Sequence, residues 1–154
     1  MSTKMMRNAA GLLWVLALMG CPTGAVPGIE PDSFDFGLSG AQEVPSVDTT
    51  ATGQGTATLE GNQLTVDGTF EGLSSDLLEV EGSSAHIHEA AVGENGPIVV
   101  NLDVTPGADN RSGTFVGTFD LTDEQVSAFE DGRYYVNVHT DTFPGGEIRG
   151  QLVP

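Results

Sequence analysis

Hydrophobic and polar residues alternate along most of the chain from about residue 34 onward, in short runs separated by Gly, Asn, Asp and Pro. In the stretch GTATLEGNQLTVDGTFEGL, Leu64 and Val66 fall on alternate positions after the dipeptide Gly61-Asn62. A period of two is typical of a strand with one buried face, and such a dipeptide between two runs indicates a hairpin turn. The pattern therefore predicts several short strands joined by tight turns.

The number and spacing of these runs indicate the fold class. Short strands with regular turn signals predict an all-β protein, and we expect a Greek-key antiparallel β-sandwich of seven or eight strands. The folded part spans residues 34–154, a length that fits one domain with a proper core. The main core candidates are the apolar residues Phe70, Ile98, Val100, Phe115, Phe119, Val136, Val138 and Leu152.

One segment, LTDEQVSAFEDG, breaks the period of two and predicts a short helix near Asp123–Glu130. Thr122 followed three residues later by Gln125 is the pattern of a capping box, and a glycine ends the segment. Val126 and Phe129 lie three residues apart and would face the sandwich. We expect this helix to close one end of the fold.

The first twenty residues have the pattern of an export signal rather than of a folded element. Lys4 and Arg7 precede an apolar stretch from Ala9 to Met19, which is too short to span a bilayer and has the length of a signal-peptide core. Residues 1–20 are therefore predicted to be a signal peptide.

The sole cysteine, Cys21, directly follows this signal in the sequence LMGC, which resembles a bacterial lipobox. We expect Cys21 to be lipidated and residues 21–33, rich in Pro and Gly, to form a tether. The protein would then lie in the bacterial cell envelope, anchored outside the cytoplasmic membrane. The alternative is ordinary signal cleavage with Cys21 incidental.

Composition after residue 20 excludes several classes of partner. Three arginines and no lysine remain against 22 acidic residues, a formal charge of −19. Because phosphate binding needs clustered basic side chains, nucleic acid is not expected as a partner. Acidic residues are scattered without the spacing of an EF-hand calcium loop. A protein or small-molecule partner outside the cell is compatible with the sequence but not identified by it.

Histidine placement is the main chemical signal. His86 and His88 lie two residues apart in a predicted strand and thus share a face, and His139 follows the run YYVNV in another. Three neutral imidazoles suit copper, with zinc as the alternative, and binding is expected to weaken as pH falls through about 6.5. Asp141 is the candidate acceptor for an imidazole N–H. Alternatively, His86 and His88 only bond to loop carbonyls and fix the loop GENGP.

Two resemblances add to this pattern. The runs SGAQEVPSVDTTATGQGTATLEGNQLTVDGTFEGL, AHIHEAAVGENGPIVVNL, LTDEQ and YYVNVHTDTFPGGEIRGQL together resemble a CHRD domain, a module named after chordin and widespread in exported bacterial proteins. The resemblance implies a cell-surface binding module. It covers nearly all of the chain after residue 33 but gives little biochemistry.

The second resemblance is remoter. Copper-zinc superoxide dismutases also place an H-x-H pair on one strand and a further copper histidine in a strand similar to GRYYVNVH. This resemblance implies that His86, His88 and His139 are copper ligands and that a superoxide dismutase-like enzyme is the alternative function. The chain lacks that family's bridging histidine, zinc loop and disulfide cysteines, and Arg149 is only a loose counterpart of its arginine.

Overall fold

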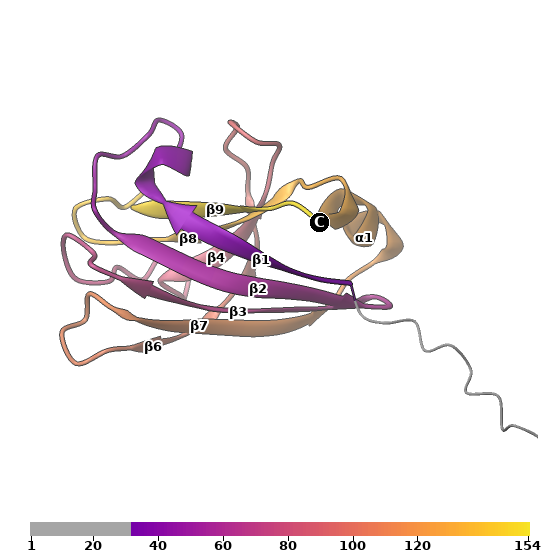
Figure 1. Cartoon of the computed structure of the whole chain (residues 1–154), viewed down its shortest axis with the longest axis horizontal. Helices are drawn as coiled ribbons and strands as arrows, with labels where there is room; N and C mark the ends of the chain where they lie inside the picture. The colour runs from indigo at the N-terminus through magenta and orange to yellow at the C-terminus, as the bar shows by residue number, and fades with distance from the viewer. Residues whose placement is uncertain (1–31) are drawn as a thin grey trace, which may run out of the picture.

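The computed structural model describes residues 32–154, and segment 1–31, which carries the predicted signal, Cys21 and most of the tether, lies outside the described residues. The elements, labelled in Figure 1, are β1 (Asp32–Ser39), the 3-10 turn η1 (Gly40–Gln42), β2 (Thr52–Glu60), β3 (Gln63–Glu71), β4 (Ala85–Glu89), β5 (Ile98–Asn101), β6 (Asp103–Pro106), β7 (Gly113–Asp120), the helix α1 (Asp123–Glu130), β8 (Tyr134–Val138) and β9 (Ile148–Leu152). Residues 32–154 are thus all-β apart from one short helix and one helical turn.

All nine strands form one antiparallel sheet in the order β5-β4-β8-β9-β1-β2-β3-β7-β6. The connections β3–β4 and β7–β8 cross from one half of this order to the other, as in Greek-key folds. The sheet curls so that β4, β8 and β9 lie behind β1, β2 and β3 in Figure 1. The predicted Greek-key β fold is confirmed, and the predicted turn at Gly61-Asn62 joins β2 to β3.

The structure has nine strands, where seven or eight were expected, because the run IVVNLDV divides at Leu102. Its first half, β5, pairs with β4, and its second half, β6, pairs with β7. These are the two ends of the strand order, so Leu102 alone joins the two edges of the sheet. Leu102 is 1% exposed and its N–H donates to the Ala85 carbonyl at 3.0 Å. Periodicity cannot reveal this change of partner within one apolar run.

The core lies between the two halves of the curled sheet. Of the predicted core residues, five are buried in it: Phe70, Phe115, Val136, Val138 and Leu152. Val100 and Phe119 are partly buried at its margin. The prediction for Ile98 was wrong, because a bulge between Ile87 and His88 shifts the register and places Ile98 opposite His88.

The helix α1 has the predicted bounds and cap. Thr122 accepts from the Gln125 N–H at 3.3 Å, and the Gln125 side chain accepts from the Thr122 N–H at 2.9 Å. Phe129 is fully buried and Val126 packs at the margin of the core, so the predicted inner face is confirmed. Within residues 32–154, no helix has the length and apolar character that a membrane span requires.

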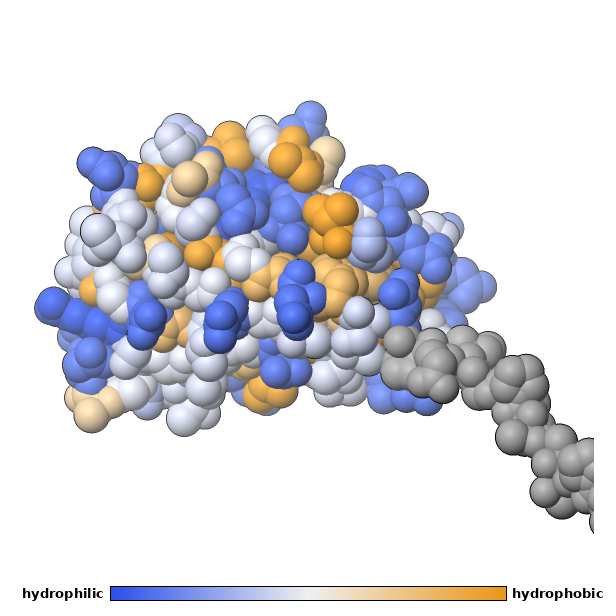
Figure 2. All heavy atoms as spheres, viewed as in Figure 1, coloured by the Kyte–Doolittle hydropathy of each residue, from blue (hydrophilic) through white to orange (hydrophobic). Residues whose placement is uncertain are grey.

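The outward face of β1, β2, β3 and β7 is polar and open to water. Figure 2 shows mostly blue and pale residues over this part of the molecule. Hydroxyl groups pair across the strands, with Ser33 to Thr58 at 3.0 Å and Thr65 to Thr118 at 3.2 Å. The alternation of the sequence here separates the core from solvent.

Candidate metal centre

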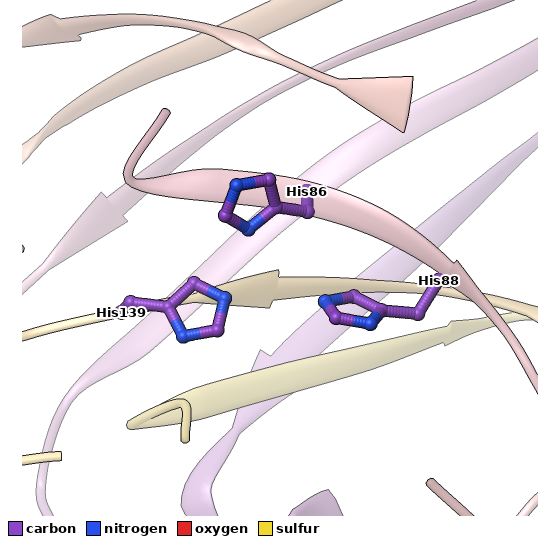
Figure 3. A group of neighbouring side chains, drawn as sticks. All are labelled: His86, His88 and His139. Carbon is purple, nitrogen blue, oxygen red and sulfur yellow. The ribbon is translucent and has the colours of Figure 1, made fainter. Parts of the chain in front are cut away.

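The three histidines meet on the outward face of the other half of the sheet. Neighbouring strands β4 and β8 pair His86 with Asn137 and His88 with Tyr135, and His139 directly follows β8. Because side chains alternate along a strand, all three imidazoles lie opposite the core residues of β4 and β8, as predicted. Figure 3 shows that the rings of His86 and His88 extend from the same strand, β4, toward the ring of His139.

These imidazoles are close together and shielded from water. His86, His88 and His139 are 0%, 8% and 3% exposed. One nitrogen from each ring lies within 4.8 Å of the others. This spacing is wider than the 3–4 Å expected for nitrogens that share one copper or zinc ion, so small ring rotations must accompany binding.

Each ring uses one nitrogen for a backbone carbonyl and leaves the other free. His86 Nε2 lies 2.7 Å from the Val80 oxygen, His88 Nδ1 3.0 Å from that of Gly96, and His139 Nδ1 3.0 Å from that of Pro144. A carbonyl can only accept, so these nitrogens carry the proton. The remaining nitrogens, which are buried and without a partner, are His86 Nδ1, His88 Nε2 and His139 Nε2.

For His88 the loop-fixing interpretation of HIH is confirmed, whereas the metal-binding interpretation stays a prediction; His88 has one nitrogen available for each role. Its Nδ1 fixes the GENGP loop through Gly96, and its Nε2 carries a lone pair toward the other histidines. The prediction that Asp141 accepts an imidazole N–H was wrong. Asp141 is exposed, and all three acceptors are backbone carbonyls of loops that fold over the sheet.

Burial keeps these imidazoles neutral. It lowers the pKa of His86 and of His88 below the ordinary value of 6.5. Burial and, to a smaller extent, the proximity of His86 together lower the pKa of His139 to about 4. Neutral imidazole is the form that ligates metal, so binding should persist to lower pH than the 6.5 expected from the sequence.

Tyr135 and Arg149 form a stack on His88 that the sequence did not reveal. The Tyr135 ring lies 4.9 Å from the His88 ring with an interplanar angle of 8°, and the Arg149 guanidinium carbon lies 3.5 Å from the centroid of Tyr135. Arg149 is 1% exposed. Arg149 lies in β9 opposite Asn137 of β8, and this position could have indicated the stack. Using it requires knowledge of which strands pair.

The loop 90–97 covers this stack. The Tyr135 hydroxyl accepts from the Gly96 N–H at 3.2 Å, and Arg149 donates to the Glu94 carbonyl at 2.7 Å. A Cβ at Gly96 would overlap the Glu89 carbonyl, so only glycine lets the loop lie this close. Glu89 itself is the last residue of β4 and pairs with Arg133 at 2.9 Å.

Two carboxyl groups are buried in the part of the chain that the structure describes. Glu147 is fully buried and accepts from the hydroxyls of Thr49, Ser74 and Thr140 and from the Ser74 N–H, at 2.7–3.0 Å. Glu43 is 7% exposed, and one of its oxygens has no partner. Burial raises the pKa of Glu43 to about 7, although the charge of Arg149 opposes this.

The family comparison agrees with the resemblance seen in the sequence. A model of the CHRD domain matches residues 34–152, which include most of β1, all of β2 to β9 and all three histidines. The chain belongs to the CHRD family. The matched residues also include Tyr135 and Arg149. Neither the search of curated proteins nor that of solved structures found a match.

Proposed function

We propose that this CHRD domain is a binding module of the bacterial cell envelope that holds a copper or zinc ion through His86, His88 and His139. One observation carries the proposal: three buried nitrogens, each without a hydrogen-bond partner, lie within 4.8 Å of one another. A buried acceptor left without a donor costs free energy, and a shared cation satisfies all three at once.

The donor set indicates the class of metal. Three neutral imidazoles suit copper and zinc, whereas calcium and magnesium require oxygen ligands. The carbonyls of Val80, Gly96 and Pro144 hold the imidazole tautomers and orient the free nitrogens, the usual role of groups behind metal ligands. A bound ion would supply a Lewis-acidic or redox-active centre; the chain supplies its placement and its exclusion from water.

Attachment to the envelope is the second part of the proposal. Support comes from the signal-like residues 1–20 and the lipobox-like LMGC at Cys21. The Cys21→Ser variant should leave the membrane fraction for the soluble fraction after export, while a Ser33→Ala variant remains with the membrane. Equal partitioning of both variants would contradict lipidation at Cys21.

A copper-dependent superoxide dismutase-like activity is the second candidate. The combination of an H-x-H strand with a third histidine on the neighbouring strand favours it. Against it, the Arg149 guanidinium bonds to loop carbonyls and lies on the Tyr135 ring, and the net negative charge repels an anionic substrate. Superoxide consumption by the copper-loaded protein, compared with the same amount of free copper, tests this candidate.

The metal proposal is tested by titration of the purified, metal-stripped protein with copper and with zinc. One equivalent should bind, and the His86→Ala and His139→Ala variants should each lose about 100-fold or more in affinity, since two ligands remain. The Asp141→Asn variant is the matched control, because Asp141 is exposed and contacts no imidazole. Loss of affinity in the control alone, or no binding by the wild type, would overturn the proposal.

A further inference from the structure

Arg149 carries a buried positive charge that no carboxylate neutralises directly. Among residues 32–154, Arg111 and Arg133 each form an ion pair, whereas Arg149 has no carboxylate oxygen within 4.0 Å. Its nitrogens donate instead to the carbonyls of Glu94 and Ala91 and to side-chain amide oxygens, 2.7 Å away at Gln151. A charge held in this way, 1% exposed, is poorly screened by water.

The stack connects this charge to the candidate metal centre. Arg149 lies on one face of Tyr135, and His88 stacks 4.9 Å away on that ring. The Arg149 guanidinium is therefore separated from the His88 imidazole by one aromatic ring. The ring between them excludes water from the path and keeps the interaction strong.

We propose that Arg149 is a specificity-determining residue that biases the three-histidine centre toward monovalent copper and against divalent ions such as zinc. The proposal rests on the metal-binding function proposed above. Repulsion between two charges scales with their product, so the same arginine opposes a divalent ion about twice as strongly as a monovalent one. Neutral imidazoles bring no negative charge that would favour the divalent ion.

Two carboxylates modify this field. Glu81 follows Val80, whose carbonyl accepts from His86, but the Glu81 side chain is exposed and its charge is screened by solvent. Glu43 is buried beside Arg149 and, when ionised, offsets part of its charge. Removing the Glu43 charge should therefore act in the opposite direction to removing the Arg149 charge.

The experiment measures the affinities of the metal-stripped protein for Cu⁺, under anaerobic conditions, and for Zn²⁺, by competition with chelators at pH 8, where Glu43 is mostly ionised. The quantity compared is the ratio of the two affinities. In Arg149→Gln, the ratio of the Zn²⁺ affinity to the Cu⁺ affinity should rise about tenfold. Arg149→Lys, which keeps the charge, should stay near the wild-type ratio. Glu43→Gln should shift the ratio severalfold toward Cu⁺.

A purely structural role of Arg149 predicts a different result. If the arginine only fixes loop 90–97, Arg149→Gln weakens both metals together and the ratio does not move, which would overturn the inference. If Arg149→Gln does not fold, Glu43→Gln carries the test, and an unchanged ratio there overturns it. Failure of the wild type to bind either metal contradicts the proposed function itself, which is a separate outcome.

Discussion

The two halves of the sheet obey the same alternation but use their outward faces differently. On β1, β2, β3 and β7 the outward residues are hydroxyl and acidic side chains in water, as Ser33 and Thr58 illustrate. On β4, β8 and β9 the outward residues are also polar, yet loops bury them. Polar residues in water cost nothing, whereas buried ones must be paired or serve a ligand. The difference makes the second face the candidate for a functional site.

This difference arises because loops cover the outward face of β4, β8 and β9. Of the described glycines, Gly96 has the least space for a side chain. The Gly96→Ala variant should lose about 4 kcal/mol of unfolding free energy, because the added Cβ overlaps the Glu89 carbonyl and lifts the loop from the sheet. Gly145→Ala is the matched control, since a Cβ there meets nothing within 4 Å. Urea denaturation of both variants measures the contrast, and equal stabilities would show that the loop does not seal this face.

Acidic residues on the two faces should respond differently to truncation. Glu147→Ala leaves the hydroxyls of Thr49 and Thr140 and the Ser74 N–H without their acceptor, and should cost about 3 kcal/mol. Asp67→Ala, on the exposed face, should change stability by less than about 0.5 kcal/mol. A thermal unfolding series gives both values; a similar cost for the two would remove the energetic distinction between the faces.

The buried carboxyl of Glu43 predicts a pH dependence. Its folded-state pKa of about 7 exceeds the ordinary value of 4.5, so between these values the folded protein binds the proton more readily than the unfolded chain. This stabilisation is complete below about pH 4.5 and is lost as pH rises through about 7. Relative to Glu43→Gln, the wild type should therefore lose about 2 kcal/mol from pH 4.5 to pH 8. Parallel stability profiles would contradict a buried, uncharged Glu43.

The smallest expected effect concerns the Tyr135 hydroxyl. Tyr135→Phe keeps the ring between His88 and Arg149 but removes the acceptor of the Gly96 N–H, which should cost about 1 kcal/mol. Hydrogen exchange at the Gly96 amide should quicken, while metal affinity stays close to that of the wild type. Loss of metal affinity in this variant would mean that the hydroxyl, and not the ring, supports the centre.

Local rules were sufficient for much of this molecule. The period of two located the strands, the Thr122–Gln125 pair located the helix, and the spacing of His86 and His88 placed both on the face that His139 also occupies. These features depend on neighbours in the sequence. The helix bounds and the shared face of His86 and His88 were therefore predictable without knowledge of the fold, whereas the approach of His139 depends on the pairing of β4 with β8.

Features that depend on distant segments were not predictable. The loss of Ile98 from the core required the bulge in the β4–β5 pairing, where β5 carries one extra residue, and the stack required Arg149 to meet Tyr135 across two paired strands. Asp141 was a reasonable acceptor for a histidine on its own segment, but the loop after it turns back and presents the Pro144 carbonyl first. Local sequence patterns do not predict which loop will pack over a given face of the sheet.

The single-residue link at Leu102 also bears on aggregation. The two edge strands of this sheet, β5 (Ile98–Asn101) and β6 (Asp103–Pro106), are consecutive in the chain and short. Within residues 32–154, they are the edges at which a strand of another molecule could pair with the sheet. Pro106 has no N–H to donate, which shortens the usable length of the second edge further. Long unprotected edges are the usual templates for fibril growth, and short ones resist it. The link that divides an apolar run thereby protects a nine-stranded protein from joining edge to edge with its own copies.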